Sequence, residues 1–440
     1  MKFTKLSQIA HCLQLKVDEK EITGFSIDSR EVKKGDLFFA LKGANFDAHG
    51  FLKEVAFRGA AAAVVEASFL GESSGLPLLK VPDVIEALQK LAQTIQMMRK
   101  QRIVAVTGSV GKTTTKEFIT TLLSQKYSVA KTPGNNNSQV GLPLAILNAS
   151  GEEEFFVAEM GMSQAGHIRK LVEIVPPEVA VVTKIGHANI EYFSDGFEGI
   201  AAAKAEILSH PKTTHAVLNR QVLAYQAFQK EYPLQKKIFA LSPEEGDFVL
   251  EDGWVIKEGE QYSHSFRLPF SATHLCEDFI AAASVARILG LSWNQIMSGA
   301  HHLKTADKRF ERVERNGFTI INDCYNASPE SMEAALLNLP IPAFGAKTIA
   351  VFGEMVDLGS LSEQKHRDVA QMALGKVDHF LCYGKGCLPM LDIFNKTGKP
   401  AEFFRDLKHL KSTLFEICKP GDVILIKGSR SNKLWQILEN

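Results

Sequence analysis

The stretch "VTGSVGKTTTKE" at residues 106–117 has residue types and spacing that could bind a phosphate group. The β-branched run "RIVAV" comes just before the glycines, and "TTKEFITTLLSQ" after them has helical apolar spacing. A strand, a glycine-rich turn and a helix in this order present backbone N–H groups at a helix N-terminus, where they bind phosphate. Lys112 can then reach the β- and γ-phosphates, and the Thr113 hydroxyl can ligate Mg²⁺. The residues expected to hold the nucleotide are Thr107, Gly108, Ser109, Val110, Gly111, Lys112 and Thr113.

This loop departs from the full Walker form G-x-x-x-x-G-K-[ST], because Val106 stands where the first glycine would be. The departure argues against a motor protein or a GTPase.

The chain has 50 Lys and Arg residues and 50 Asp and Glu residues, so it has no net charge. A neutral chain has no overall field to hold nucleic acid or an anionic membrane, and we expect neither as a partner.

The bulk composition predicts a globular protein of the cytoplasm. Apolar residues make up 45% of the 440 residues, and charged residues make up 23%. None of the six cysteines forms a C-x-x-C pair, which argues against a zinc ribbon or a redox pair. The first residues lack the apolar core of a signal peptide, and no apolar run approaches the length of a membrane span. We expect a cytoplasmic monomer without a membrane span.

The pattern of apolar runs divides the chain into three sections, and we expect an α/β protein of three domains. Residues 1–82 mix short strand-like runs with helical pieces, which predicts a small N-terminal α/β domain. Residues 83–306 open with a helix and then alternate strands and helices, which predicts a parallel sheet covered by helices. Within them, residues 244–270 are typical of a small antiparallel β insertion. Residues 307–440 alternate again and predict a doubly wound, Rossmann-like domain.

Further motifs accompany the loop along the chain. They are "DSR" followed by "GDLFFALKGANFDAHGF", then "TPGNNNSQVGLP", "AEMGM", "GHANIEYF", "AAAKAEIL", "INDCYNASPESM", "VFGEMVDLG" and "LIKGSRS". Together, and in this order, they resemble the Mur ligase family over nearly the whole chain. The resemblance implies an N-terminal UDP-binding domain, a central P-loop ATPase and a C-terminal Rossmann-like domain that binds the incoming dipeptide.

The resemblance also implies a reaction. "DCYNASPESM" and "GEMVDLG" favour the family member that joins D-alanyl-D-alanine to UDP-N-acetylmuramoyl-tripeptide, with ATP cleaved to ADP and phosphate. Such a ligase activates a carboxylate as an acyl phosphate, which an amine then attacks. Two anions must meet in the first step, so positioning and cations provide most of the catalysis.

Four residues have catalytic or metal-binding roles by this resemblance. Lys112 contacts the phosphates, and Glu159 joins Thr113 at one Mg²⁺. His187 would serve a second Mg²⁺ ion together with Lys204, which the family carries as a carbamylated lysine. On its sequence alone, Lys204 could also be a surface lysine of an alanine-rich helix. Because a carbamate forms from a neutral amine, we expect burial to lower the pKa of Lys204.

The remaining site residues also follow from the resemblance. It places His274, Asp278, Arg309, Asp323 and Tyr325 at the nucleotide, and Asp28, Ser29, Arg30, Asn135, Asn137, Asn326, Lys427, Ser429 and Arg430 at the substrates. Asp278 replaces the asparagine that usually contacts adenine, and a carboxylate cannot donate the amide hydrogen bond. Ser138 also stands where the family usually has an asparagine. On residue types alone, residues 28–30 could equally be a surface turn.

Two other interpretations remain open at the level of sequence. A folylpolyglutamate synthase-type ligase shares the ATPase and the C-terminal domain but would lack a separate UDP-binding domain, which residues 1–82 supply. A non-catalytic ATP-binding module needs Lys112 but has no use for Lys204 or "DCYNASP". The sequence does not distinguish meso-diaminopimelate from L-lysine as the third residue of the tripeptide.

Overall fold

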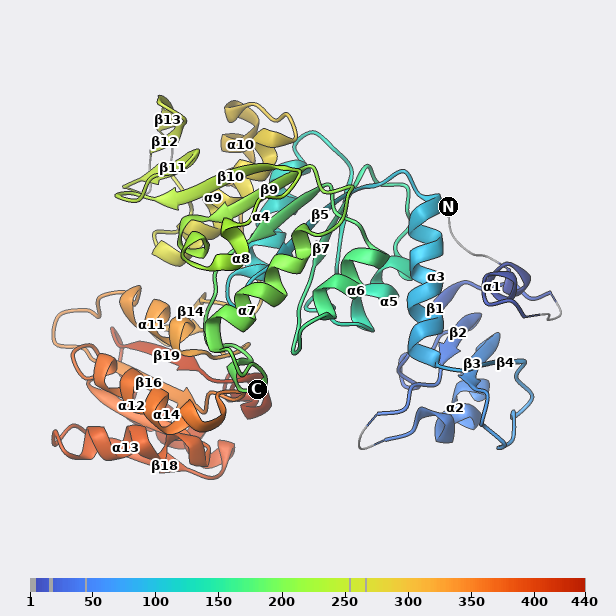
Figure 1. Ribbon diagram of the computed structural model, residues 1–440. Helices are drawn as coiled ribbons and strands as arrows, with labels where there is room; N and C mark the ends of the chain where they lie inside the picture. The colour runs from blue at the N-terminus through green and yellow to red at the C-terminus, as the bar shows by residue number, and fades with distance from the viewer. Residues whose placement is uncertain (1–4, 16–18, 44–45, 253–254, 266, 440) are drawn as a thin grey trace.

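The computed structural model describes residues 5–15, 19–43, 46–252, 255–265 and 267–439. Three separate β-sheets organise this part of the chain, and Figure 1 shows the N-terminal and C-terminal sections on different sides of the central one. Among the helices of the described ranges, none combines the length and the apolar character that crossing a bilayer requires. The three-section α/β architecture expected from the sequence is confirmed.

The N-terminal section is a four-stranded parallel sheet in the order β1-β2-β3-β4. Its strands are β1 (Gly24–Ser26), β2 (Asp36–Phe39), β3 (Ala62–Glu66) and β4 (Leu78–Val81), and its helices are α1 (Leu6–Cys12) and α2 (Leu52–Phe57). All four residues of β2 are buried, as expected for a parallel strand covered on both faces.

Helix α3 (Val84–Met98) connects this section to the central one. Asp83 caps it by accepting a hydrogen bond from the Glu86 backbone N–H at 2.8 Å. The helix packs against α5 (Gly141–Asn148) and α6 (His167–Ile174), so it belongs to the central section. The Asn148 side chain bonds both the N–H and the C=O of Phe25, at 3.1 and 2.9 Å, and so joins the end of α5 to β1.

The central section is built on a nine-stranded sheet in the order β13-β12-β11-β10-β9-β8-β5-β7-β6. Its strands are β5 (Arg102–Thr107), β6 (Val129–Lys131), β7 (Phe155–Glu159), β8 (Val179–Val182), β9 (His215–Asn219), β10 (Gln235–Leu241), β11 (Phe248–Glu251), β12 (Val255–Glu258) and β13 (Gln261–Ser265). Side chains of β5 alternate between two cores: Ile103 and Ala105 face α3, α5 and α6, whereas Val104 and Val106 face the opposite helices. Those opposite helices are α4 (Lys112–Leu123), α9 (Thr273–Ile288) and α10 (Trp293–Ala300).

Residues 244–270 differ in one respect from the expected antiparallel insertion. β12 and β13 are antiparallel, but β11 pairs in parallel with β10, so the segment extends the central sheet. Asp247 explains the parallel pairing. Its carboxylate accepts from the Ile238 N–H at 2.8 Å and from Lys237 Nζ at 3.0 Å. These bonds hold the start of β11 beside β10.

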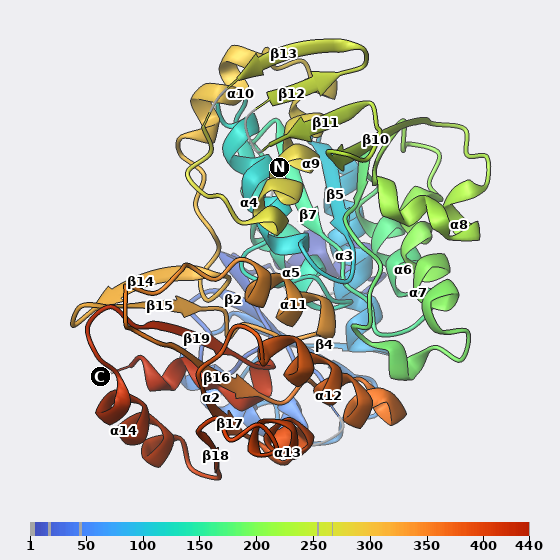
Figure 2. The ribbon, with the colours of Figure 1, turned by 90° about the vertical axis from the view of Figure 1, so that its left-hand side faces the viewer.

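The C-terminal section has a six-stranded sheet in the order β14-β15-β19-β16-β17-β18, parallel except for β14, and Figure 2 shows it below the central sheet. Its strands are β14 (Glu311–Arg315), β15 (Phe318–Asn322), β16 (Thr348–Gly353), β17 (His379–Tyr383), β18 (Ala401–Phe404) and β19 (Val423–Lys427). Helices α11 (Pro329–Leu337), α12 (Ser362–Ala373) and α13 (Leu388–Asn395) cover one face, and α14 (Leu407–Ile417) covers the other. The expected cap of α11 is present, with Ser328 at the N-cap and Pro329 in the first turn.

Candidate active site

A cavity of about 320 Å³ lies where the central and C-terminal sections meet. Most of the residues expected at the site line it. From the central section these are Gly108, Ser109, Val110, Gly111, Lys112, Thr113, Asn135, Asn137, Glu159, Lys204, His274 and Asp278, and from the C-terminal section Arg309, Asp323, Tyr325, Asn326 and Lys427. The expected residues outside the lining are Asp28, Ser29, Arg30, Thr107, His187, Ser429 and Arg430.

The phosphate loop needs its two glycines because other chain segments approach it closely. A Cβ atom on Gly108 would lie 1.8 Å from the Thr183 hydroxyl oxygen. A Cβ on Gly111 would lie 2.4 Å from a carboxyl oxygen of Asp278, and Gly111 has the left-handed φ of 84° at the start of α4. Thr183 also donates to the Val110 carbonyl at 2.6 Å, so the end of β8 fixes the loop. Thr107 lies behind it and donates to the Met160 carbonyl at 2.8 Å.

The Lys112 ammonium group lies inside the loop that it follows. It donates to the Gly108 carbonyl at 2.8 Å and to the Ser109 carbonyl at 3.1 Å. Burial lowers the pKa of Lys112, and the negative charge of Glu159 opposes that change. This places one cation within the curve of the loop, where phosphate oxygens can replace the backbone carbonyls as its partners.

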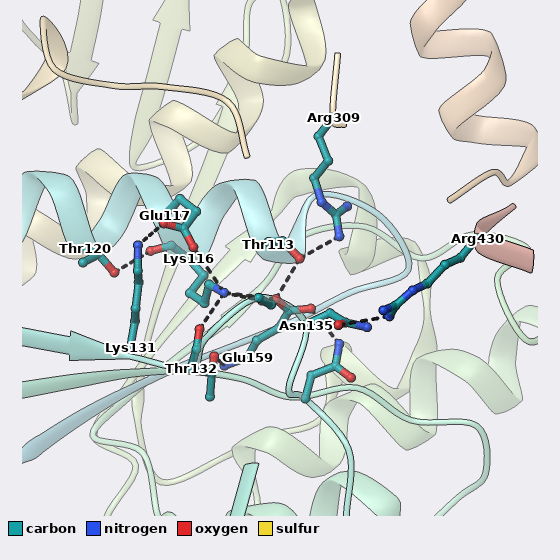
Figure 3. Close-up of polar contacts among 12 residues, drawn as sticks. Thr113, Lys116, Glu117, Thr120, Lys131, Thr132, Asn135, Glu159, Arg309 and Arg430 are labelled. Carbon is teal, nitrogen blue, oxygen red and sulfur yellow. Dashed lines mark hydrogen bonds and ion pairs between the residues drawn. The ribbon is translucent and has the colours of Figure 1, made fainter. Parts of the chain in front are cut away.

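Glu159 and Thr113 form the pair that suits a magnesium ion. Glu159 is 1% exposed, and its two carboxylate oxygens accept from the Thr113 hydroxyl at 2.8 Å and from the Asn137 amide at 2.7 Å. Arg309 of the C-terminal section donates to the same Thr113 oxygen at 2.9 Å (Figure 3). A carboxylate and a hydroxyl beside a phosphate loop are the hard oxygen ligands that Mg²⁺ prefers, so these residues fit the ion.

Lys204, in α7 (Gly196–Ala205), is buried without a charged partner. It is 2% exposed, and it makes no hydrogen bond or ion pair within the described part of the chain. Burial, together with the nearby charge of Lys112, lowers the pKa of Lys204 well below its usual value. The expectation of a depressed pKa at this lysine is confirmed, and the surface-lysine interpretation is wrong.

His187 is turned toward the C-terminal section. Its backbone N–H donates to Glu330 Oε1 at 2.8 Å, and its ring Nδ1 contacts the same oxygen. Its ring also packs edge-on against Phe197, with 4.8 Å between centroids. Across the described ranges, no cluster of three or more His, Cys, Asp or Glu residues is grouped to hold a metal.

Glu330 was not identified from the sequence. It lies in the first turn of α11, where an acidic residue is ordinary, so its type and position gave no signal of a role. Only the tertiary structure brings it to His187. Its second carboxylate oxygen, Oε2, is buried and has no partner among the described atoms.

The C-terminal wall of the cavity is held by one buried lysine. Lys427 donates to Asp323 Oδ2 at 2.6 Å and to the Asn326 carbonyl at 3.1 Å. Above them, the Arg309 guanidinium lies 4.1 Å from the centre of the Tyr325 ring. Lys427 thus fixes the turn that presents Asn326 and Tyr325 to the cavity.

Ser429 and Arg430 follow β19, and their side chains have different surroundings. Arg430 lies over Tyr325 at 5.6 Å and donates to the Asn135 amide oxygen at 3.2 Å, across the boundary between sections. Ser429 is 1% exposed, and its hydroxyl accepts from the Val356 N–H at 3.0 Å. Ser429 therefore holds the turn after β16, and its contact with a substrate stays a prediction.

Asp278 and His274 are two polar side chains that lie one turn apart on α9. Asp278 accepts from the Thr115 hydroxyl at 2.9 Å, and burial raises the pKa of its carboxyl group to about 8. Glu277 raises this pKa further, whereas Lys184 and Arg309 lower it. Burial lowers the pKa of His274 to about 4, and its Nδ1 atom has no hydrogen-bond partner among the described residues. Burial therefore favours the uncharged form of both side chains.

Asp278→Asn is expected to stabilise the protein more as pH rises. Unfolding lowers the pKa of this carboxyl from about 8 to about 3.8, so the unfolded chain releases a proton between these values while the folded chain keeps it. The wild type therefore loses stability as pH rises from about 4 to about 8, and the asparagine variant lacks this loss. Thermal unfolding at pH 5 and pH 8 should show the advantage of the variant growing with pH.

Asp28→Asn is the control for this test. Arg30 lowers the pKa of Asp28 to about 2, so its charge does not change between pH 5 and pH 8 and its effect should be constant there. An effect of Asp278→Asn that is equally constant would contradict the neutral form of Asp278.

Residues 28–30 form a closed turn just after β1. The Arg30 side chain donates to Asp28 Oδ1 at 2.9 Å, and Ser29 donates to Glu54 Oε2 at 3.4 Å. The three residues thus lie in the N-terminal section, away from the cavity. This agrees with the surface turn that residue types alone allowed, and their contact with a uridine nucleotide stays a prediction.

The loop, the Thr113–Glu159 pair and the cavity between two α/β sections define a nucleotide-dependent enzyme of the P-loop class. The chain belongs to the Mur ligase family. Residues 21–96 match the Mur ligase family catalytic domain, residues 106–285 the Mur ligase middle domain, and residues 308–430 the Mur ligase glutamate ligase domain.

Three relatives cover nearly the whole chain. The UDP-N-acetylmuramoyl-tripeptide–D-alanyl-D-alanine ligase of Bacillus subtilis (strain 168) is 33% identical over 438 residues, which cover 96% of this chain and 94% of the relative. Crystal structure I of MurF from Acinetobacter baumannii has a TM-score of 0.83 at 28% identity, and covers 98% of this chain and 97% of that one. The MurF ligase of Thermotoga maritima in complex with ADP has a TM-score of 0.78 at 31% identity, and the match covers 94% of this chain and 96% of that one.

Proposed function

We propose that the cavity between the central and C-terminal sections is where this enzyme carries out its reaction. The chain is an ATP-dependent, ADP-forming ligase of peptidoglycan synthesis, which joins D-alanyl-D-alanine to UDP-N-acetylmuramoyl-tripeptide. The observation that supports this location is the buried Glu159, held beside the Thr113 hydroxyl at 2.8 Å and facing C-terminal residues across the cavity. An ATP-binding module without catalysis would have no use for the C-terminal wall.

The reaction needs an activated carboxylate, because a carboxylate oxygen is a poor leaving group. The tripeptide carboxylate attacks the γ-phosphorus of ATP, and the bond from this phosphorus to the β-phosphate oxygen breaks. The products of this step are an acyl phosphate and ADP. The dipeptide amine then attacks the acyl carbon, phosphate departs, and the nitrogen loses a proton. Lys112 and the N–H groups of residues 108–113 orient the triphosphate and offset its charge. Arg309 adds a second cation from the C-terminal section.

Thr113 and Glu159 would hold a Mg²⁺ ion. When bound, the ion neutralises phosphate charge in the first step. Asn137 fixes the Glu159 carboxylate by its hydrogen bond at 2.7 Å, which leaves the other carboxylate oxygen beside the Thr113 hydroxyl. Arg309 would exchange its bond with Thr113 for one with a phosphate oxygen.

Lys204 is proposed to be carbamylated and, with His187, to serve a second Mg²⁺. The neutral amine adds to CO₂ and releases a proton, which converts the lysine into an N-linked carboxylate. The burial of Lys204 without a charged partner favours the neutral amine that this addition requires. His187 keeps its Nδ1 on Glu330, and this contact fixes the orientation of its ring.

The nucleotide and the two substrates are assigned to different walls. We place His274, Asp278, Asp323 and Tyr325 at the nucleotide. A protonated Asp278 presents one O–H donor and one C=O acceptor, as an asparagine amide would, so its replacement of the usual asparagine preserves both functions. The substrate residues are Asn135, Asn137, Asn326, Lys427, Ser429 and Arg430, with Asp28, Ser29 and Arg30 at the UDP end.

The domain limits and the setting are part of this proposal. We assign residues 1–82 to UDP-substrate binding, 83–306 to ATP binding and ligation, and 307–440 to the incoming dipeptide. All six cysteines are free, which suits the reducing cytoplasm. A monomer suffices because one chain supplies both walls of the cavity.

Phosphate release should require ATP, UDP-N-acetylmuramoyl-tripeptide and D-alanyl-D-alanine together, because the first step consumes ATP and the tripeptide and the second consumes the dipeptide and releases phosphate. Mass spectrometry should show a single new amide. Assays with tripeptides ending in meso-diaminopimelate or in L-lysine would identify the accepted third residue. Phosphate release from ATP alone, or ligation of glutamate to a folate in place of the dipeptide reaction, would contradict the proposal.

A further inference from the structure

Helix α4 carries a second lysine one turn after Lys112. The Lys116 side chain has no exposed surface, whereas most lysines keep their ammonium group in water. Lys116 does not line the cavity, so it has no direct access to a bound substrate. Burying an ammonium group costs free energy unless it is hydrogen-bonded and paired, so its partners indicate what the charge does.

The backbone partners of Lys116 belong to the segment of residues 132–137, which is part of the connection from β6 to α5. The Lys116 ammonium donates to the Thr132 carbonyl at 2.8 Å and to the Gly134 carbonyl at 2.7 Å (Figure 3). It also lies 3.3 Å from Glu117 Oε1 and 3.7 Å from Glu159 Oε2. Two of its three N–H donors thus fix the backbone of this segment, and its charge lies between two carboxylates.

The two carboxylates differ in position and in their other partners. Glu117 has a second cation, because Lys131 forms an ion pair with it near the surface. Glu159 is buried, with the Lys116 ammonium at 3.7 Å and the charge of Lys112 nearby, and its hydrogen bonds come from the neutral groups of Thr113 and Asn137. Lys116 therefore offsets the charge of the carboxylate that faces the phosphate loop.

The 132–137 segment in turn positions Glu159. The Thr132 hydroxyl accepts from the Glu159 N–H at 3.1 Å, and the Asn137 amide donates to Glu159 Oε1 at 2.7 Å. The Asn137 carbonyl accepts from the Gly161 N–H at 2.8 Å, so the segment is bound on both sides of the carboxylate. A displacement of this segment would move Asn137 and release Glu159 from its place beside Thr113.

We propose that Lys116 is a positioning residue for ligation: its ammonium holds the 132–137 segment so that Asn137 fixes Glu159 beside Thr113. The inference rests on the proposed function, since it takes Glu159 and Thr113 as the ligands of the divalent cation. Lys116 acts through the segment and touches no reacting atom. An unbranched apolar side chain without donors at this position should therefore disturb binding of the divalent cation more than binding of the nucleotide.

Lys116→Met keeps an unbranched apolar side chain that is one atom shorter, and it removes all three donors. Binding of Mn²⁺ to the protein–ADP complex, followed by electron paramagnetic resonance, should weaken by about tenfold or more, as is usual when a residue supporting a metal ligand is lost. The affinity for ADP in the presence of a chelator should change by less than about threefold, because the phosphate loop is intact. In turnover, kcat should fall by about a hundredfold.

A second variant removes the same link from the other side. Asn137→Ala deletes the amide that holds Glu159 and leaves Lys116 in place, so it should weaken Mn²⁺ binding similarly. In the double variant the two effects should not add, because both act through one contact. Unchanged Mn²⁺ affinity in Asn137→Ala would overturn the proposal even if Lys116→Met did not fold.

Lys399→Met is the matched control. Lys399 also donates to two backbone carbonyls, those of Leu374 at 2.7 Å and Val377 at 2.6 Å, but it lies in the C-terminal section away from the cavity. It should lower the unfolding temperature while keeping kcat and Mn²⁺ affinity. Equal losses in both lysine variants, or normal Mn²⁺ affinity in Lys116→Met, would overturn the positioning role. The Mn²⁺ measurement needs no turnover, so a wild type without ligase activity would contradict the proposed function separately.

Discussion

Replacement of Lys112 by alanine is expected to lower the rate of ligation by about a thousandfold or more, while the affinity for UDP-N-acetylmuramoyl-tripeptide stays within about tenfold. The ammonium group lies inside the phosphate loop, where it bonds the carbonyls of Gly108 and Ser109. Its loss removes the cation closest to the transferred phosphoryl group. The uridine end of the substrate is assigned to the N-terminal section and should bind as before.

Lys126→Ala provides a control at a lysine that lies just beyond the end of α4. Lys126 follows α4, and its ammonium donates to the Gly290 carbonyl at 2.9 Å near the surface. This variant should keep the wild-type rate, because it loses a similar backbone contact far from the cavity. Steady-state phosphate release and direct binding of the UDP-substrate would measure both effects. Near-wild-type turnover of Lys112→Ala would remove the loop from the mechanism.

The elements around this loop were predictable because local patterns determine them. A few neighbouring residues determine each of three features: the alternation of β5 side chains between two cores, the glycines of the loop and the Ser328 cap of α11. In these cases local propensity and the tertiary structure agree. The burial of Lys204 was expected only from the resemblance to the Mur ligases, because its alanine-rich helix alone also allowed a surface lysine.

Contacts between distant segments were not predictable from local patterns. Glu330 and His187 lie in different sections, and their contact exists only because the start of α11 meets the loop that follows β8. Nothing in the sequence near Lys116 indicates a role, because its bond to the Thr132 carbonyl is formed only in the tertiary structure. Ser429 belongs to a recognisable motif, yet its hydroxyl is occupied by the Val356 N–H. The parallel pairing of β11 likewise depends on Asp247 reaching the neighbouring strand.

The same reasoning explains why Asp278 required the structure. From the sequence, an aspartate in place of the family asparagine loses the amide donor. Its burial between Thr115 and the loop raises the pKa of this carboxyl to about 8, and the protonated form restores a donor. Here the tertiary environment changes the chemistry of the residue, and no spacing in the sequence reports it.

Lys204→Ala is expected to remove most of the activity without harming the fold. The Lys204 amine is buried and has no charged partner in the described part of the chain, so no ion pair is lost on its removal. Lys204→Met, which keeps the volume, should therefore unfold at a temperature equal to or above that of the wild type. Lys212→Ala, at an exposed lysine beyond the same helix, should leave the rate unchanged.

Chemical rescue separates a carbamate from a lysine that acts as a cation. If Lys204 carries a carbamate, a short-chain carboxylic acid should restore part of the rate of Lys204→Ala, because a free carboxylate can occupy the vacated position. Lys204→Glu should stay impaired, since its shorter stem displaces the carboxylate by roughly an ångström or more, which can cost about a hundredfold. The wild type should lose activity when dissolved CO₂ is removed and regain it with bicarbonate. Full activity of Lys204→Ala would contradict the assignment outright. Loss of activity without carboxylate rescue or CO₂ dependence would instead leave Lys204 acting as an unmodified amine.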